Sequence, residues 1–179
     1  PWEMNSDNAY YNQHEDIKSG IDAFINTGVP AAKLVVGLPL YARTMQISSL
    51  GDKNGLYSIV QGVGFGDYED GILDYKCLVN PILDPVNGCG SIKPIAGIQS
   101  LGFINQSNDT NNLWTIYGAT TGYQPWAYNS NTFVTYDDTA SAVLKTKAMK
   151  NSQLGGMMFW ELDGDSTNPE LSIVQAVKD

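Results

Sequence analysis

The chain has 179 residues, of which 42% are hydrophobic, so a packed core is affordable and a disordered protein is not expected. The length fits one sizeable domain, or one domain that carries an inserted second one. The net charge of −9 at pH 7 disfavours nucleic acid and anionic membrane surfaces as partners. A neutral or weakly charged substrate fits this charge better.

The sequence contains neither a membrane-spanning run nor a signal peptide. No apolar run reaches the roughly 18–20 residues that cross a bilayer. The first residues, PWEMNSDNAYYNQ, lack a basic start and an apolar stretch. Because the chain begins with Pro1 rather than Met, we expect its natural start to lie upstream.

Cofactor and metal motifs are not found in the sequence. The two cysteines, Cys77 and Cys89, have no metal-site spacing. They either form one disulfide in an oxidising compartment or are two unrelated core residues. The single histidine, His14, is expected at the surface or at a helix start. We therefore predict no cofactor and no metal.

The first predicted elements are a helix and a buried strand. Residues 14–28 are predicted to be helical, because four apolar residues fall on one face: Ile17, Ile21, Phe24 and Ile25. Gly28 ends this helix. The apolar run within residues 33–41 predicts a strand that is buried on both faces. A helix followed by such a strand is typical of α/β proteins.

Residues 46–132 have a different character. They are rich in Gly, Asn and Ser and show no strong helical stripe. A weak helix is predicted to begin near Asp74. Short strands are predicted at 72–75, 98–104, 113–117 and 126–128. We interpret this region as an inserted small α+β subdomain.

After Tyr136 the α/β pattern resumes. Asp137 or Asp138 is expected to cap a helix that ends near Asn151, and residues 157–162 form a second buried strand. A last helix, running to residue 177, is predicted to begin with a cap, a first-turn proline and a first-turn acid: Asn168, Pro169 and Glu170.

This order of elements predicts the C-terminal part of a (β/α)8 barrel. Residues 1–45 and 133–179 would be barrel parts, and residues 46–132 the insertion. Two strands do not close an eight-stranded barrel, so the N-terminal part of the same barrel is an expected partner.

The candidate site lies after the two predicted barrel strands, since barrel enzymes work at that end of their strands. The first strand is followed by Tyr41 and Arg43, which point the same way. The second leads to Trp160, Glu161 and Asp163. A phenol, a guanidinium and an indole suit a carbohydrate, which has flat C–H faces and polar edges. The alternative, that the aromatic residues are core and the arginine is an ion-pair partner, stays open at this point.

Two segments carry a family resemblance: Lys33–Arg43 (KLVVGLPLYAR) and Leu154–Asp165 (LGGMMFWELDGD). They are similar to the seventh- and eighth-strand motifs of family 18 glycoside hydrolases, the chitinase family. GVPAAK, FVTYDD and the initial PWE also fit this family, and GILDYKCL resembles part of the chitinase insertion domain. The resemblance implies the last two strands and their helices of a TIM (β/α)8 barrel, with an inserted chitinase insertion domain.

The resemblance also implies a set of substrate-binding residues. Trp160 would lie under the distorted sugar at the cleavage point, with Tyr41 and Arg43 in the same region. Trp2 and Glu3 would lie on the leaving-group side, with Trp2 as a stacking platform. The implied ligand is chitin or a chitooligosaccharide.

The family's catalytic glutamate is absent from the sequence. It ends a D-x-x-D-x-D-x-E motif, which does not occur here, and it is expected upstream of Pro1. Glu161 is interpreted as a cap or a surface acid. In the family, the substrate's own acetamido oxygen attacks the anomeric carbon and the glutamic acid protonates the leaving oxygen. We expect a secreted chitinase that cleaves β-1,4-linked N-acetylglucosamine polymers with retention, and a chain that is inactive by itself.

Three other interpretations compete with the chitinase. A chitinase-like lectin would keep the cleft without the acid. An endo-β-N-acetylglucosaminidase acting on glycoproteins ranks lower, because the insertion is long. A freestanding structural module is disfavoured by the open strand edges.

Overall fold

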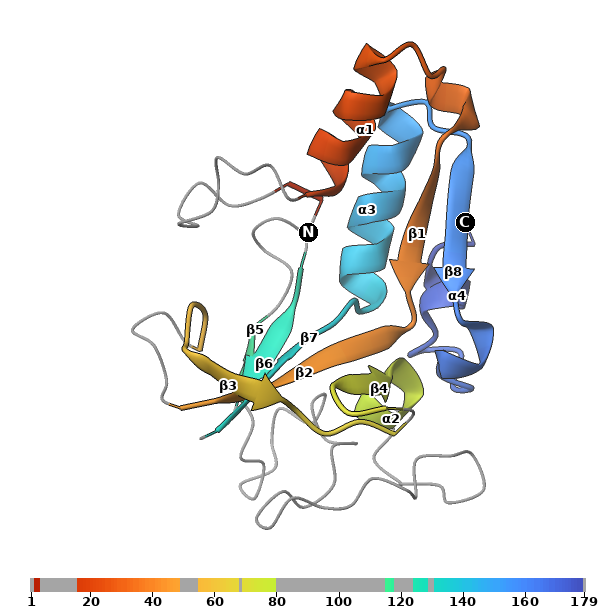
Figure 1. The fold of residues 1–179 in the computed structure, drawn as a ribbon. Coiled ribbons are helices and arrows are strands. Elements are labelled where there is room, and N and C mark those ends of the chain that lie inside the picture. The colour runs from red at the N-terminus through yellow and green to blue at the C-terminus, as the bar shows by residue number, and fades with distance from the viewer. Residues whose placement is uncertain are drawn as a thin grey trace.

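The computed structural model describes residues 2–3, 16–48, 55–67, 69–79, 115–117, 124–128 and 131–178. In this part of the chain two sheets are packed with helices (Figure 1). No helix in the described ranges is long and apolar enough to cross a membrane.

The elements follow one another in this order: α1 (Ile17–Asn26), the 3-10 helix η2 (Ala31–Lys33), β1 (Val35–Pro39), β2 (Tyr41–Ile47), β3 (Val60–Val63), β4 (Ile72–Asp74), α2 (Tyr75–Val79), β5 (Thr115–Tyr117), β6 (Trp126–Tyr128), β7 (Thr132–Thr135), α3 (Thr139–Asn151), β8 (Gly156–Trp160), the 3-10 helix η6 (Leu162–Gly164) and α4 (Ile173–Ala176).

The first sheet is a parallel pair, β1 and β8, in register from Val35 opposite Gly156 to Pro39 opposite Trp160. One face is covered. There Val36 packs with Met149 of α3, and apolar residues of α1 join the same cluster. The other face exposes three apolar side chains: Val35 (59%), Met158 (48%) and Trp160 (63%).

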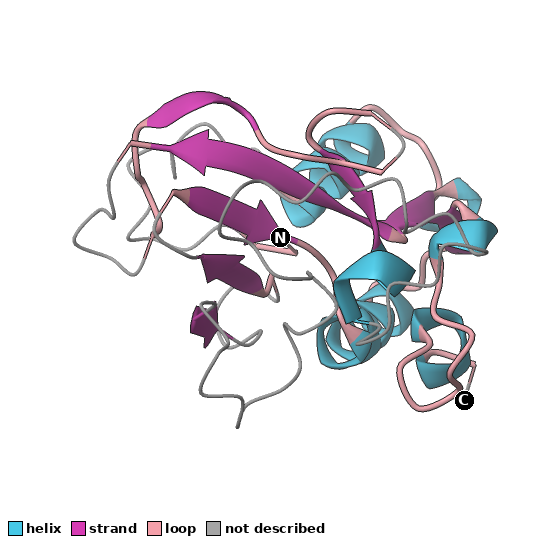
Figure 2. Cartoon of the chain, turned by 90° about the horizontal axis from the view of Figure 1, so that it is seen from below, coloured by secondary structure: helices cyan, strands magenta, loops and turns pink. Residues whose placement is uncertain are grey.

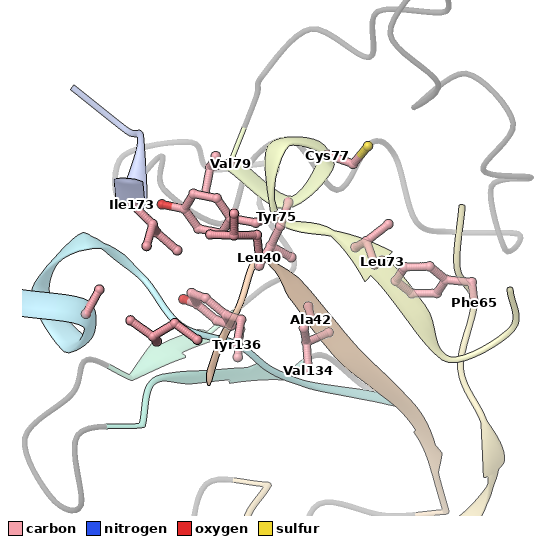
Figure 3. Packing of buried hydrophobic residues seen from close by; sticks show 14 residues of the cluster. Leu40, Ala42, Phe65, Leu73, Tyr75, Cys77, Val79, Val134, Tyr136 and Ile173 are labelled. Atoms are coloured by element: carbon pink, nitrogen blue, oxygen red, sulfur yellow. The ribbon is translucent and has the colours of Figure 1, made fainter. Parts of the chain in front are cut away.

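The second sheet is antiparallel, in the order β3-β2-β7-β6-β5, with β4 also pairing with β2. Figure 2 shows its strands fanned out to one side of most of the helices. One face of the sheet carries six buried residues: Ala42, Thr44, Leu73, Ala127, Thr132 and Val134. Figure 3 shows Leu40 and Tyr75 next to each other in the core cluster that lies on this face.

Several predicted elements are confirmed. The helices α1 and α3 and the strands β1 and β8 lie where the patterns place them, and α2 begins directly after Asp74. The predicted burial of β1 on both faces was wrong for this chain, since Val35 is 59% exposed on the face that no described helix covers. Asp138 caps α3, accepting from Ser141 N at 2.7 Å, while Ser141 Oγ accepts from Asp138 N at 2.9 Å. The predicted strand 98–104 lies outside the described residues.

Three strands were not predicted: β2, β3 and β7. The expected boundaries of the insertion, after residue 45 and after residue 132, fall inside β2 and β7 respectively. The antiparallel sheet therefore continues into segments that the sequence pattern assigned to the barrel.

The predicted start of the last helix was wrong. Asn168 O accepts from Ser172 N at 3.0 Å and closes a separate turn, and α4 begins only after Ser172. The reason is Asp165, whose carboxylate accepts from Ile173 N at 2.9 Å and Val174 N at 3.1 Å. Asp165 thus satisfies two N–H groups at the start of the helix from outside it, while Ser172 Oγ accepts from Gln175 N at 3.0 Å.

Candidate functional site

The two sheets meet at Leu40, which has 0% exposed surface. Its backbone N–H donates to Trp160 O at 2.8 Å, and its carbonyl accepts from Tyr75 N at 3.0 Å. The carboxyl end of β8, the start of β2 and the start of α2 therefore converge at one residue.

Trp160 is the most exposed large aromatic residue in this region, at 63%. It ends β8 and lies in register with Pro39. The peptide bond between Trp160 and Glu161 is cis. The following η6 turn lies close against β1–β2, because a Cβ on Gly164 would come within 2.4 Å of Leu40 O. The indole of Trp160 is therefore exposed, while the backbone of the turn that follows it is tightly packed.

Tyr41 and Arg43 share one face of β2, as their spacing predicts. The guanidinium carbon of Arg43 lies 5.5 Å from the centre of the Tyr41 ring, a cation–π contact. Ala42, between them, points into the core with 0% exposure. Both residues belong to the antiparallel sheet rather than to a loop after the first barrel strand, because β2 follows β1 after a single residue.

The face of β2 that carries Arg43 continues across β7 to β6. Arg43 lies opposite Thr135, which in turn lies opposite Trp126. Tyr128 is half-buried on the same strand, and a Cβ on Gly55 would lie 2.9 Å from its ring. Close packing against Gly55 supports a structural role for Tyr128.

The structure does not bring Trp2 to this site. Trp2 is 6% exposed and packs with Val36 and Met149, on the helix-covered face of β1. Its carbonyl accepts from Lys18 N at 3.0 Å at the start of α1. Glu3 is exposed beside it. The stacking role that the resemblance implies for Trp2 stays a prediction.

Of the acids that follow Trp160, two are exposed and one holds a helix start. Glu161 is exposed and precedes η6 without a side-chain capping bond. The carboxylate of Asp163 is 74% exposed, whereas Asp165 holds the start of α4. Within the described ranges, no three His, Cys, Asp or Glu side chains gather as a metal site would need.

The sequence interpretation missed a buried ion pair between Asp137 and Lys145. Lys145 Nζ donates to both carboxylate oxygens, at 2.6 and 2.8 Å, and to Gln124 Oε1 at 3.1 Å. Ser141 Oγ donates to the same carboxylate at 2.7 Å. The signal was present, because Lys145 lies four residues after Ser141 and four before Met149, on the buried side of α3.

Two buried phenols lie in the core rather than in the site. Tyr75 donates to Leu171 O at 3.0 Å. Burial raises the pKa of Tyr75 well above its usual value, and the charges of Asp138 and Asp165 add to this. Burial also raises the pKa of Tyr136, with a contribution from Asp138.

Cys77, on α2, is disulfide-bonded. The other cysteine of the chain, Cys89, lies outside the described residues. Of the two alternatives left open by the sequence, the structure supports a disulfide at Cys77.

Comparison with known families identifies this arrangement. The model of glycosyl hydrolases family 18 matches residues 3–165, which is most of the chain. The chain belongs to this family. The resemblance of the two strand motifs is thereby confirmed.

Curated family 18 chitinases are similar to the chain over most of its length. Chitinase A1 of Niallia circulans is 30% identical over 152 residues, covering 84% of this chain and 18% of the relative. Chitinase B of Serratia marcescens is 34% identical over 152 residues, covering 80% of this chain and 27% of the relative. The chain therefore spans about a quarter or less of the length of these relatives.

Solved structures share the fold. The structure of human YKL-39, a pseudo-chitinase with retained chitooligosaccharide binding properties, covers 99% of this chain with a TM-score of 0.72 and 21% identity. The chain covers 43% of that structure. The chitinase ChiW from Paenibacillus matches with a TM-score of 0.67 and 27% identity, over 100% of this chain and 18% of that one. The chain thus has part of the family's α/β fold, and its antiparallel sheet is consistent with the insertion domain.

Proposed function

We propose that the full-length protein is a secreted chitinase that binds and cleaves β-1,4-linked N-acetylglucosamine polymers, and that this chain supplies one side of its cleft. The observation that carries the proposal is the position of Trp160. Its indole is 63% exposed at the point where β8 meets the start of β2. Tyr41 and Arg43 begin that strand.

The chemistry of these three residues fits an acetamido sugar. An exposed indole offers a flat apolar surface for the C–H face of a pyranose ring. The Arg43 guanidinium carries several donors and the Tyr41 hydroxyl both donates and accepts, so the pair is suited to hydroxyl and amide oxygens. The chain lacks the family's acidic motif, so we assign the catalytic glutamate to a segment outside it.

The exposed face of the first sheet supports a larger barrel. Parallel strands are normally covered on both faces. Here Val35 is 59% exposed and Met158, which lies opposite Gly37, is 48% exposed. We assign the remaining strands of the same barrel as the cover of Val35 and Met158, with Trp160 left open at the carboxyl end of β8.

A titration of the full-length protein with chitohexaose tests the proposed site. If a sugar ring covers about 80 Å² of the Trp160 indole at about 25 cal/mol per Å², Trp160→Ala loses about 2 kcal/mol, or roughly thirtyfold in Kd. Phe24→Ala is the matched control, because Phe24 is an aromatic residue of α1 with 58% exposure. Equal affinity of Trp160→Ala and the unmodified protein would contradict the proposal.

A non-catalytic lectin is the second candidate. It is favoured by the fold shared with human YKL-39, which is a pseudo-chitinase that retains chitooligosaccharide binding. Hydrolysis of chitohexaose by the full-length protein supports the enzyme, whereas binding without hydrolysis supports the lectin. Hydrolysis by residues 1–179 alone would contradict our assignment of the glutamate to another segment.

A further inference from the structure

Lys76 connects the two parts of the proposed sugar site. It lies in the second position of α2, directly after β4. Its ammonium donates to the backbone carbonyl of Asp163 at 2.7 Å, in the turn that follows Trp160. Figure 1 shows α2 near the carboxyl end of β8.

The same ammonium is also held by the last residue of β4, the strand that pairs with the start of β2. It pairs with Asp74 Oδ2 at 3.0 Å, and both side chains are largely covered, at 16% and 20% exposure. Asp74 lies directly opposite Tyr41 in the β2–β4 register. Lys76 therefore links the end of β4, which pairs with the strand that carries Tyr41, to the turn that follows Trp160.

This bridge has a specific consequence for Trp160. The indole itself is mostly exposed, so its position depends on the backbone on either side of it. On the strand side, Trp160 O accepts from Leu40 N at 2.8 Å. On the turn side, the backbone is held by the close approach of Gly164 to Leu40, by the bond from Lys76 and, at the end of the turn, by the bonds of Asp165 to the start of α4.

We propose that Lys76 is a positioning residue, which holds the turn after Trp160 against the strand of Tyr41 and so sets the separation and orientation of the two rings for the sugar. The inference rests on the proposed function of Trp160. If Lys76 has this role, a residue that follows β4 of the second sheet affects the sugar affinity of Trp160 at the end of the first sheet.

The accepting atom distinguishes this role from a simple surface ion pair. The carboxylate of Asp163 lies 3.9 Å from Lys76 Nζ and is 74% exposed, so it adds little to the bridge. Asp163→Asn keeps the backbone carbonyl and is expected to bind chitohexaose as the unmodified protein does. Lys76→Met keeps an unbranched apolar side chain as far as Cε but loses the terminal donor.

The test is carried out on the full-length protein with chitohexaose as the probe. We expect Lys76→Met to weaken binding about three- to tenfold, because a charge-assisted bond to the backbone of the turn is lost. Lys76→Arg, which keeps a cationic donor, is expected to recover most of the affinity. Lys18→Met removes a lysine from another ion pair, Lys18–Asp22 at 2.9 Å on α1, and is expected to leave the affinity unchanged.

A spectroscopic measurement separates positioning from stability. The indole N–H resonance of Trp160, assigned by its loss in Trp160→Phe, is expected to shift in Lys76→Met and to return in Lys76→Arg. If Lys76→Met does not fold, Asp74→Asn keeps the lysine and is expected to shift the same resonance to a smaller extent.

The outcomes distinguish this inference from the proposed function. If Trp160→Ala binds chitohexaose normally, the proposed site is wrong. If Trp160→Ala loses binding while Lys76→Met keeps both its affinity and its Trp160 resonance, only the role of Lys76 is wrong. A lower melting temperature in Lys76→Met with an unshifted resonance also overturns it, since that result describes a structural lysine.

Discussion

Replacing Lys145 by Met removes the cation from a buried ion pair. The side chains of Lys145 and Asp137 are 2% and 1% exposed, so water cannot replace the ammonium. In the variant, the Asp137 carboxylate keeps the bond from Ser141 Oγ and loses those at 2.6 and 2.8 Å from the lysine. A buried carboxylate that has lost its cation strongly destabilises the folded state, because its charge is no longer compensated.

The expected loss is large compared with the stability of the fold. Breaking a buried pair from one side costs about 3–5 kcal/mol, whereas small domains have about 5–15 kcal/mol in total. For a chain of this size, that loss lowers the melting temperature by roughly 6–20 °C. Denaturant unfolding of Lys145→Met against the unmodified chain measures it.

The double variant Asp137→Asn/Lys145→Met checks the reasoning. Because it removes both charges, its loss should be smaller than the sum of the two single losses by about 2 kcal/mol. The exposed lysine variant Lys18→Met is the control and is expected to leave the midpoint unchanged. A loss below about 1 kcal/mol in Lys145→Met, or additive losses in the double variant, would refute the view that the pair is buried and coupled.

Three further predictions concern the core and the turn after Trp160. Tyr75→Phe removes the hydrogen bond to Leu171 O, and it should lower the free energy of unfolding by about 1 kcal/mol at neutral pH. Because burial raises the folded-state pKa of Tyr75, the phenol of the unfolded chain ionises first as pH rises above about 10, and the unmodified chain loses stability there. The difference in unfolding free energy between the unmodified chain and Tyr75→Phe should therefore narrow as pH rises, measured by urea unfolding. A constant difference would contradict this. Gly164→Ala places a Cβ at 2.4 Å from Leu40 O, a backbone atom, and should lower the melting temperature through a cost of about 1–3 kcal/mol; an unchanged melting temperature would show that the turn yields easily. Asp165→Ala removes the acceptor of two N–H groups at the start of α4 and should cost about 1–2 kcal/mol in denaturant unfolding, more than Asp163→Ala.

The elements with a strong local pattern were predictable. The stripe of α1, the capping residue Asp138 and the apolar runs of β1 and β8 each contain their own signal within a few residues. The family motifs also lie in these segments, so the sequence located Trp160 at the end of its strand.

The antiparallel sheet was harder to predict because its strands are short and their partners are distant in sequence. β2 pairs with β7, about 90 residues further on, and neither strand is fully apolar. Likewise, Asp165 accepts from the first N–H of a helix that begins eight residues later, a contact that lies outside the local cap at Ser172. Contacts of this kind arise from the tertiary arrangement and are invisible to a local reading.

The prediction that Tyr41 and Arg43 point the same way is confirmed, for a reason that the structure makes clear. Burial alternates without interruption from β1 into β2, since Val36, Leu38, Leu40, Ala42 and Thr44 are all at most 6% exposed. The chain therefore keeps a period of two while it passes from the parallel sheet to the antiparallel one, and the buried Leu40 is the point of change. A shift of one residue at Leu40 would turn Tyr41 and Arg43 into the core and Ala42 onto the exposed face. The same residue binds the backbone of Trp160 and of Tyr75, so the register of β2, the end of β8 and the start of α2 are fixed together. The separation between the indole and the Tyr41–Arg43 pair is thus set by one buried leucine and adjusted from the other side by Lys76.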